Sequence, residues 1–172
     1  MGKKWLDIVY NEKSSIKLKQ HYKSWANDYD QDLIDWGYAY PSQLKKIMSQ
    51  DIKLKKSSKI LDAGCGTGLV AKVLGDMNFK NIVGLDYSLD MLKIAKDKKI
   101  YTRLIQESLN KKTSLRSNQF DVVLCTGVLT SGHVGAKAIN ELIRVTKNKG
   151  YLILSIAESI YEKLGFKDEI EK

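Results

Sequence analysis

The sequence predicts an α/β fold in which a central, mostly parallel sheet of about five strands lies between two layers of helices. From Lys59 onward, short apolar runs alternate with longer runs of helical periodicity, which is the pattern of repeated strand–helix units. The chain of 172 residues is long enough for one well-packed core and too short for two ordinary ones. We therefore expect a single domain over residues 1–172.

The predicted elements follow in order along the chain. Residues 1–57 are rich in aromatics and partly helix-like, and the only proline, Pro41, indicates a helix that begins at Ser42 or just before it. Residues 58–156 form the α/β core, and residues 157–172 are expected to form a C-terminal helix. Strands are expected at about 59–63, 81–86, 101–106, 120–126 and 150–156.

In the segments between these strands, apolar residues recur at the spacing of an α-helix. "LVAKVLGDM" follows the first strand and "SLDMLKIAKDK" the second, where Ser88 can cap the helix and Met91 and Leu92 are its first inward residues. The polar stretch 110–119 predicts a surface loop before the fourth strand. A further helix is expected before the fifth strand and to end at "KNKG". Its apolar stripe consists of Ala138, Ile139, Leu142, Ile143 and Thr146.

The stretch "KILDAGCGTGLV" places three glycines between the first strand and the first helix of the core. Gly64, Gly66 and Gly68 allow a tight turn and let a ligand approach the backbone without meeting a Cβ atom. Asp86 ends the second strand and follows Gly68 at roughly the 20-residue spacing expected of an acid that binds a ribose. The pattern therefore predicts a ligand that contains a ribose.

Two ligand classes fit this prediction, a dinucleotide such as NAD and S-adenosylmethionine. The dinucleotide pattern G-x-G-x-x-G requires a third glycine at position 69, but Leu69 stands there and the glycine comes one position earlier. Asp62 precedes the first glycine by two residues, where its carboxylate would repel a pyrophosphate and favour a ligand with an ammonium and a sulfonium. S-adenosylmethionine is therefore the predicted cofactor.

The motifs resemble those of a known family. "ILDAGCGTG" resembles the first motif of the class I S-adenosylmethionine-dependent methyltransferases, and "GLDYSLDML" is similar to their second-strand acid followed by a helix. This resemblance covers about 59–156 and implies a Rossmann-like three-layer sandwich and S-adenosylhomocysteine as product. More narrowly, the chain resembles the methyltransferase-like proteins of the Williams-Beuren syndrome type. The segments that carry the narrower resemblance are "VYN", "HYKSWANDYDQDL", "WGYAYP", "GVLTSGHVG" and "ELIRVTKNKGYLILS".

The resemblance also implies roles for individual residues. Asp62 and the glycine loop would hold the methionine part of the cofactor, Asp86 the ribose hydroxyls, and Tyr87 and Met91 would flank the adenine. Glu107 would accept a hydrogen bond from the adenine amino group. The full set of expected cofactor-binding residues is Asp62, Gly64, Cys65, Gly66, Thr67, Gly68, Asp86, Tyr87, Met91, Glu107, Ser108, Thr126 and Tyr29.

Several of these assignments leave an alternative open. Asp86 can be merely a strand-end acid, Met91 fits the core as well as an adenine wall, and Glu107 can be a solvated loop residue. The N-terminal aromatics either pack on the sheet or cover the cofactor. Tyr29 is expected over the methionine end, and core packing is the alternative for both Tyr29 and Trp25.

The fourth strand ends beside the crevice where a methyl acceptor would enter. The methyltransferases that act on planar amines have Asn or Asp followed by two prolines and an aromatic there, whereas this chain has Cys125, Thr126, Gly127 and Val128. That difference argues against nucleobase-amine acceptors. His133, on the loop after this strand, is the candidate general base because an imidazole titrates near neutrality. It can equally shape the pocket or cap the next helix.

Composition limits the partners and the location. The net charge is +9, but only three of the 29 basic residues are arginine and the lysines are scattered, which indicates a solvated surface more than a nucleic-acid site. No apolar run approaches the roughly 20 residues that span a bilayer, and the N-terminus lacks the apolar stretch of a secretory signal. We expect a cytoplasmic protein. Cys65 and Cys125 are too few for a metal site, so no metal is expected.

The chain departs from the family pattern at its C-terminal end. The resemblance implies seven strands, the last two of which form an antiparallel hairpin beside the fifth, but residues 157–172 do not read as strands. An uncovered fifth strand would present free backbone groups to another chain. We expect the C-terminal helix or a second subunit, in a homodimer, to cover that edge, or the sequence to be a shortened version of a longer enzyme.

Taken together, the sequence predicts an enzyme that transfers a methyl group from S-adenosylmethionine to a small-molecule acceptor. Such a transfer is an in-line displacement that depends mainly on positioning and the exclusion of water. One alternative is a catalytically inactive module that still binds S-adenosylmethionine. Another is an RNA or protein methyltransferase that uses the basic surface.

Overall fold

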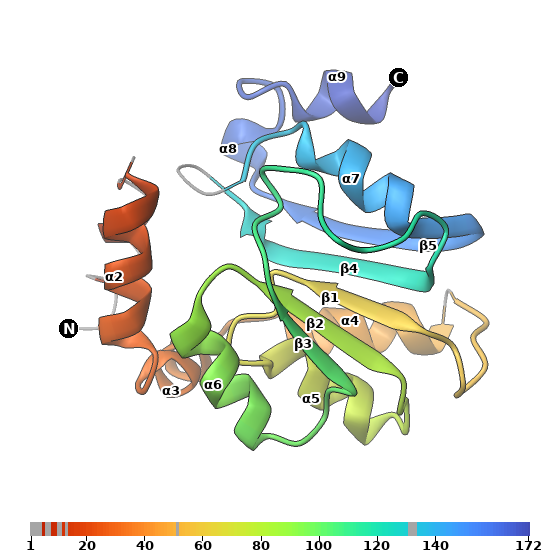
Figure 1. Ribbon diagram of the computed structural model, residues 1–172, viewed down its shortest axis with the longest axis horizontal. Coiled ribbons are helices and arrows are strands. Elements are labelled where there is room, and N and C mark those ends of the chain that lie inside the picture. Colours follow the sequence, from red (N-terminus) through yellow and green to blue (C-terminus); the bar gives the residue numbers. More distant parts are fainter. Residues whose placement is uncertain (1–4, 6–7, 10–11, 13, 51, 131–133) are drawn as a thin grey trace.

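Five parallel strands in the order β3-β2-β1-β4-β5 form the centre of the structure (Figure 1). The α/β class and the central parallel sheet are therefore as predicted. The strands are β1 (Ile60–Ala63), β2 (Ile82–Asp86), β3 (Arg103–Gln106), β4 (Phe120–Leu129) and β5 (Thr146–Ile156). The computed structural model describes residues 1–172 apart from 1–4, 6–7, 10–11, 13, 51 and 131–133.

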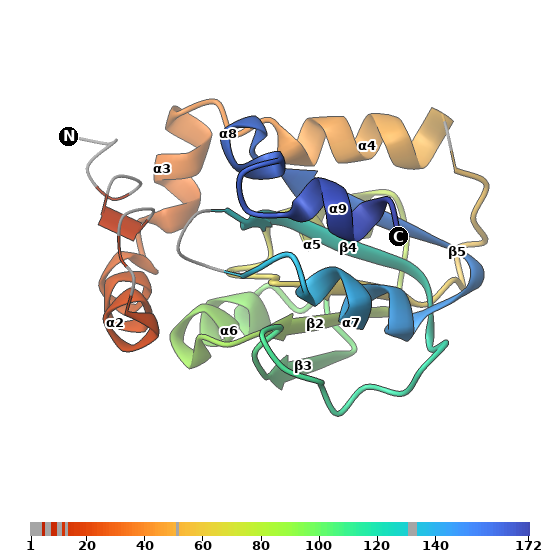
Figure 2. The same cartoon turned by 90° about the horizontal axis from the view of Figure 1, so that it is seen from above.

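Helices cover both faces of the sheet, as Figure 2 shows for α4 on one side and α7 on the other. On one face α4 and α5 share a buried cluster with β1, β2 and β4, and on the other α7 packs against β4 and β5. The helices are α2 (Ser15–Trp25), α3 (Tyr29–Asp35), α4 (Tyr40–Gln50), α5 (Leu69–Asp76), α6 (Leu89–Asp97), α7 (Ala138–Val145), α8 (Glu158–Tyr161) and α9 (Phe166–Ile170).

The central strands are buried on both faces, as expected of a parallel sheet between two helical layers. Every residue of β1 and β2 is buried, which explains why these strands are nearly continuous apolar runs that end in a polar residue or a glycine loop. Cys65 and Cys125 are buried free thiols within this apolar interior. No helix in the described part of the chain is long and apolar enough to cross a membrane.

Two helix starts follow directly from their sequences. The side chain of Ser88 caps α6 by accepting a hydrogen bond from the Met91 amide at 3.4 Å, and Met91 and Leu92 are buried, as predicted. Pro41 is the second residue of α4, where its missing N–H costs no helical hydrogen bond. Local chemistry therefore determines where both helices begin.

The predicted α7 stripe is wrong in two places. Ile143 is exposed over 53% of its surface, because Ala138, Ile139, Leu142 and Val145 already form the buried face. Thr146 is the first residue of β5, so "KNKG" lies in a strand and does not close a helix. Pairing of Thr146 with Phe120 of β4 extends the strand toward the helix.

The C-terminal residues form two short helices, α8 and α9, where one helix was predicted. A turn that ends at Gly165, with a φ of 73°, separates them. Ile160 and Phe166 are buried in the same cluster as the α7 face of the sheet, and α9 packs on α7. These helices therefore extend the layer on one face of the sheet, and among the described residues β5 pairs only with β4. A second subunit at the β5 edge remains a prediction.

Leu142 and Ile143, which are neighbours in α7, provide a stability test of the packing of α7 on the sheet. We expect Leu142→Ala to lower the free energy of unfolding by about 2 to 5 kcal/mol, because the fully buried Leu142 would leave a cavity. Ile143→Ala, on the exposed side, should change it by no more than about 0.5 kcal/mol. Urea denaturation measures both. Equal losses would contradict the assignment of the buried face.

Candidate functional site

A cavity lies at the carboxyl ends of β1, β2 and β4, beneath α2 and α3. Strand order changes direction between β1 and β4, which is the position where open α/β sheets form ligand crevices. All the predicted cofactor-binding residues except Gly68 line this cavity. The lining also includes residues that were not predicted to bind the cofactor, namely Leu18, Tyr22, Leu33, Tyr38, Leu69, Val70, Leu85, Leu109, Asn110, Gly127, Val128 and Val134.

The glycine loop between β1 and α5 is held by its own backbone amides. The amides of Gly64 and Cys65 both donate to the Leu85 carbonyl, at 2.7 and 3.0 Å. The Gly66 amide donates to Oδ2 of Asp86 at 2.9 Å. A phosphate-binding loop needs such amides for its ligand. Because the structure uses these three internally, the loop is a poor diphosphate site.

Gly64 is also required for close packing within the site. Its φ is 77°, and a Cβ atom at this position would lie 2.2 Å from Cγ2 of Val128. Val128 belongs to the last part of β4, so the cofactor loop and the end of β4 are in direct contact. Any side chain at position 64 would force these two walls of the cavity apart.

Two buried carboxylates lie in the wall of the cavity. Asp62 is 2% exposed and accepts a hydrogen bond from the Tyr101 hydroxyl at 2.8 Å. Asp86 is 8% exposed and accepts from the amides of Gly66 and Ser88. Asp62 and Asp86 have no cationic partner among the described residues that line the cavity, which include no lysine, arginine or histidine.

Burial governs the protonation of both carboxyl groups. Loss of solvation raises the pKa of Asp62 to about 7, opposed by the Tyr101 hydrogen bond and reinforced by the nearby charge of Asp86. Loss of solvation also raises the pKa of Asp86, although the Ser88 and Gly66 amides stabilise its charged form. A cationic ligand would reverse this penalty, because an opposite charge favours the ionised carboxylates. The site is therefore complementary to a ligand with positive charge.

Tyr101 is a supporting residue that no motif in the sequence singles out. Its ring fills the space left by two glycines, since a Cβ atom on Gly68 would lie 3.0 Å from this ring and a Cβ atom on Gly84 would lie 2.8 Å from it. Burial, followed by the charge of Asp62, raises the pKa of Tyr101 and keeps its hydroxyl protonated as a donor. Gly68 thus faces Tyr101 and does not line the cavity, unlike the other predicted residues.

The adenine end of the predicted site is formed by residues after β2 and β3. Glu107 and Ser108 lie in the cavity wall, and Oε2 of Glu107 accepts a hydrogen bond from the Ser114 amide at 2.8 Å. A carboxylate has two oxygens, so Glu107 keeps capacity to accept from a ligand. Met91 is 2% exposed and lines the cavity, so the core and ligand-wall interpretations both apply to it.

Aromatic side chains of the N-terminal segment cover the cavity. Tyr22, Tyr29 and Tyr38 line it, whereas Trp25 is 1% exposed and donates from Nε1 to Asp32 at 2.7 Å. The core-packing interpretation therefore applies to Trp25. Tyr29 meets the Trp25 ring edge-on at 4.6 Å, so the buried indole supports the tyrosine that faces the cavity.

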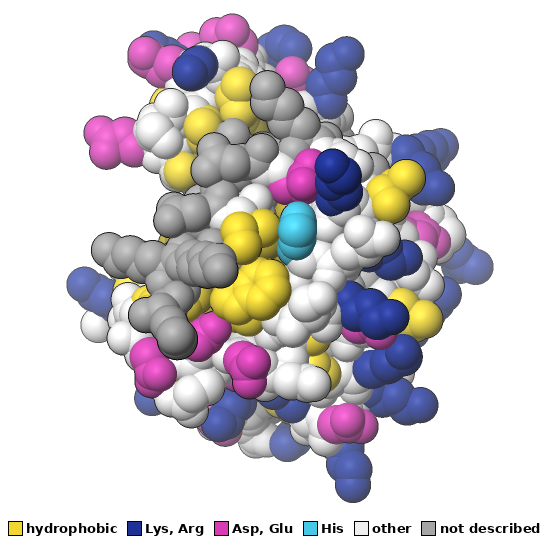
Figure 3. Space-filling model, turned by 90° about the vertical axis from the view of Figure 1, so that its left-hand side faces the viewer, with side chains coloured by type: hydrophobic (Ala, Val, Ile, Leu, Met, Phe, Trp, Pro, Cys, Tyr) yellow, Lys and Arg dark blue, Asp and Glu magenta, His cyan; other side chains and the backbone are white. Residues whose placement is uncertain are grey.

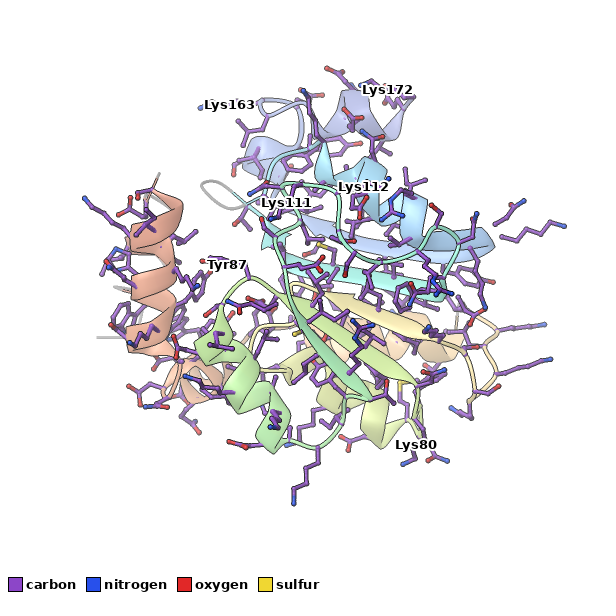
Figure 4. All side chains as sticks on the ribbon, viewed as in Figure 1. Lys80, Tyr87, Lys111, Lys112, Lys163 and Lys172 are labelled. Atoms are coloured by element: carbon purple, nitrogen blue, oxygen red, sulfur yellow. The ribbon has the colours of Figure 1, made fainter. Side chains whose placement is uncertain are left out.

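Tyr87 joins this cover to the sheet. Figure 4 shows it in the space between α2 and the core. Its ring meets that of Tyr22 edge-on at 6.4 Å. Its hydroxyl is buried and has no hydrogen-bond partner among the described residues. Buried polar atoms are almost always paired, so this hydroxyl marks a position where a ligand or ordered water would bind.

The fourth strand is longer than predicted and bulges beside the cavity. Its pairing with β5 shifts between Cys125 and Leu129, and Gly127 has a φ of 72°. The Gly127 amide donates to the Ser155 hydroxyl at 2.7 Å. A bulge redirects side chains locally. Thr126 and Val128 consequently line the cavity while the strand continues to Leu129.

The face that carries α2 has hydrophobic side chains near its centre and charged side chains of both signs around its margin (Figure 3). The candidate general base, His133, lies in 131–133, outside the described residues. Among the residues that the structure describes, no group of three or more His, Cys, Asp or Glu side chains is placed to hold a metal ion. The arrangement can bind and enclose a cationic ligand against two carboxylates.

Comparison with known proteins agrees with this geometry. A model of the methyltransferase domain family matches residues 61–154. Methyltransferase-like protein 27 of Homo sapiens is 36% identical over 152 residues, which are 87% of this chain and 61% of that protein. An uncharacterized protein of Methanocaldococcus jannaschii is 29% identical over 157 residues, 89% of this chain and 56% of that protein.

A solved structure of an S-adenosylmethionine-dependent methyltransferase from Thermotoga maritima superposes with a TM-score of 0.59. The alignment covers 86% of this chain and 69% of that one at 24% identity, which supports the fold alone.

Fold, cavity and family match together define a class I S-adenosylmethionine-dependent methyltransferase domain. The chain belongs to the methyltransferase domain family, whose model covers more than half of it. It spans about three fifths of the length of the two relatives described. The narrower resemblance to the Williams-Beuren type remains a prediction.

Asp62 should make the stability of the protein depend on pH. Its folded pKa of about 7 lies above the usual value of about 4, so unfolding releases a proton between these limits and the stability contributed by Asp62 falls as pH rises. We expect the free energy of unfolding of the wild type, relative to Asp62→Asn, to decline from about pH 4 to about pH 7 and then level off. Urea denaturation across this range measures it.

Tyr101→Phe provides the control for the Asp62 measurement. Removing the hydroxyl donor should raise the pKa of Asp62 further and extend the decline to higher pH. Parallel curves for the wild type and Asp62→Asn would contradict a buried carboxyl group with a raised pKa.

Proposed function

We propose that the chain binds S-adenosylmethionine in this cavity and transfers its methyl group to a small-molecule acceptor. The observation that carries the proposal is the pair of buried carboxylates, Asp62 and Asp86, beside a glycine loop whose amides are already bonded within the protein. This combination disfavours a diphosphate and favours an ammonium or sulfonium. The Tyr87 hydroxyl, which has no hydrogen-bond partner among the described residues, offers a further polar contact.

The residues divide the work of holding the cofactor. Asp62 would face the methionine part, and Asp86 would accept hydrogen bonds from the ribose hydroxyls while it keeps the Gly66 amide in place. Tyr87 and Met91 would flank the adenine, and Glu107 would accept from its amino group. The bound cofactor would supply an electrophilic methyl group, which leaves sulfur as the acceptor atom bonds to it.

Catalysis by the chain would rest on placement and exclusion of water. Tyr29, Leu33 and Tyr38 cover the cavity, and Val128 and Val134 form its wall near the end of β4. An acceptor that arrives protonated would need a base. His133 remains the predicted candidate, and His133→Ala should slow turnover only if it has that role.

The lining favours a small acceptor without negative charge. The lining includes the apolar or aromatic side chains of Leu18, Leu33, Tyr38, Val128 and Val134, and the described lining residues include no basic side chain. The Thermotoga maritima protein, which is similar in fold, is described as a possible histamine N-methyltransferase, and histamine is a small molecule.

An RNA or protein acceptor finds less support. Lysines lie on separated parts of the surface, as Figure 4 shows for Lys80, for Lys111 and Lys112, and for Lys163 and Lys172. A nucleic-acid site usually gathers basic residues on one face. An inactive module that only binds S-adenosylmethionine is the second candidate.

Titration calorimetry with S-adenosylmethionine, S-adenosylhomocysteine and NAD tests the ligand class. We expect the first two to bind and NAD not to bind. Binding of NAD alone would overturn the proposal. Retention of the chain on RNA at low salt, lost as salt is raised, would instead favour the RNA alternative.

Asp86→Ala should weaken the binding of S-adenosylmethionine by about 1 to 3 kcal/mol, because hydrogen bonds to a charged group are lost. Asp76→Ala, which removes an exposed carboxylate at the end of α5, is the matched control and should leave the affinity unchanged. Calorimetry measures both dissociation constants. An unchanged affinity of Asp86→Ala would refute the ribose assignment.

Turnover separates the enzyme from the inactive module. With a metabolite extract as a source of acceptors, we expect steady release of S-adenosylhomocysteine. Mass spectrometry measures this release. The same extract passed through a filter that removes macromolecules should support equal release if the acceptor is small. Binding of S-adenosylmethionine without release in any extract would favour the inactive module.

A further inference from the structure

The side chain of Asp30 connects three parts of the molecule. Asp30 lies on α3, and its two carboxylate oxygens accept hydrogen bonds from the Thr67 hydroxyl in the glycine loop and from the Lys98 ammonium at the end of α6. Lys98 also donates to the Thr67 carbonyl at 2.6 Å. Each of the three residues therefore contacts the other two, and we call this group the Asp30 clamp.

The clamp is partly shielded from solvent. The side chains of Asp30 and Lys98 are 30% and 20% exposed, and Thr67 is 1% exposed. Exposed ion pairs contribute little to stability, but charge-assisted hydrogen bonds in a partly buried network contribute more. Loss of Asp30 would leave the Thr67 hydroxyl and the Lys98 ammonium without this acceptor.

The clamp lies next to the residues that cover the cavity. Tyr29 directly precedes Asp30, Leu33 follows one turn later on α3, and both line the cavity. Thr67 also lines it, from the glycine loop. The other helix over the cavity, α2, packs on α6, and its Tyr22 ring contacts that of Tyr87. The polar clamp thus fixes α3 to the loop that the cofactor would contact.

We propose that Asp30 and Lys98 are positioning residues that hold the α2–α3 segment over the glycine loop and thereby retain the cofactor. This inference rests on the proposed function. Breaking the clamp lets the segment leave the position in which Tyr29 and Leu33 complete the cavity. A protein whose binding-competent form is only partly populated binds its ligand more weakly in proportion to that population. The cofactor should then also dissociate faster.

A double-mutant cycle on S-adenosylhomocysteine binding tests the clamp. Asp30→Ala and Lys98→Met should each weaken the affinity about tenfold and raise the dissociation rate by a similar factor, as expected for loss of a charge-assisted hydrogen bond. The double variant should be no weaker than the weaker single variant, because either substitution already breaks the contact. Calorimetry and stopped-flow measurements give the two quantities.

Lys93→Ala is the matched control. Lys93 lies on the same helix as the lysine of the clamp and pairs with Asp90 at 3.0 Å, but its side chain is 65% exposed and does not reach α3. Its substitution should change the affinity by less than about twofold. Asp30→Asn, which keeps an oxygen for Thr67 and removes the charge, should fall between the wild type and Asp30→Ala.

Trypsin cleavage of α2 provides a readout that needs no ligand. Lys17, Lys19 and Lys23 are exposed sites on that helix. Cleavage there should be about tenfold faster in Asp30→Ala than in the wild type and unchanged in Lys93→Ala. Melting temperatures of all variants would show whether the core remains folded.

The outcomes separate the clamp from the proposed function. Unchanged affinity and unchanged cleavage in both single variants, or losses that simply add in the double variant, would overturn the clamp while the wild type still binds. A lower melting temperature with wild-type affinity and dissociation rate would also overturn it, because that is a purely structural role. A wild type that binds neither S-adenosylmethionine nor S-adenosylhomocysteine would overturn both the proposed function and the retention of the cofactor by the clamp.

Discussion

The site depends on the hydrogen bonds that the Asp86 carboxylate accepts from the amides of Gly66 and Ser88. These bonds join the glycine loop after β1 to the end of β2 and the start of α6. The charged group lies in the interior, where it is stable only because oriented amides replace its water. The Gly66 amide is thereby used within the protein, and the amides of Gly64 and Cys65 donate to the Leu85 carbonyl, so the loop keeps few donors for an anion. The Asp86 bonds therefore hold the loop in a shape that disfavours an anionic ligand.

The N-terminal segment completes this arrangement from outside the sheet. Its aromatic cluster supplies apolar packing around Trp25, and Tyr29 carries that packing to the cavity wall. Apolar contacts are not directional, so they hold the segment near the core without determining its alignment with the glycine loop. The polar contacts of Asp30 give that direction. Packing and polar contacts have separate roles in enclosing the cavity.

Much of the fold could be predicted because its signals are local. The "ILDAGCGTG" stretch combines a buried strand with glycines that have positive φ values, and Ser88 caps the helix that follows the second strand. Features that depend on residues far apart in sequence were not accessible in this way. Tyr101 reaches Asp62 across 39 positions, and Lys98 reaches Asp30 across 68. No spacing rule connects such pairs, since only the folded sheet brings them together.

The error over Thr146 has a similar cause. The sequence pattern placed Thr146 on the helical stripe because it follows Leu142 at a helical spacing. Pairing of Thr146 with Phe120 ends the helix earlier and makes β5 longer. Tertiary strand pairing thus overrode the local pattern. The β4 bulge at Gly127 was missed for the same reason, because it exists only relative to the register of β5.

The contact between Gly64 and Val128 restricts how a protein of this kind can diversify. A larger residue at position 128 would press on Gly64, where a Cβ atom would already lie 2.2 Å from Val128. Any change of acceptor preference made on that strand would therefore disturb cofactor binding. New preferences can arise at lower cost in the N-terminal segment, whose Leu18, Leu33 and Tyr38 border the cavity. Descendants of such a chain would differ most in their first forty residues and least along the inner strands.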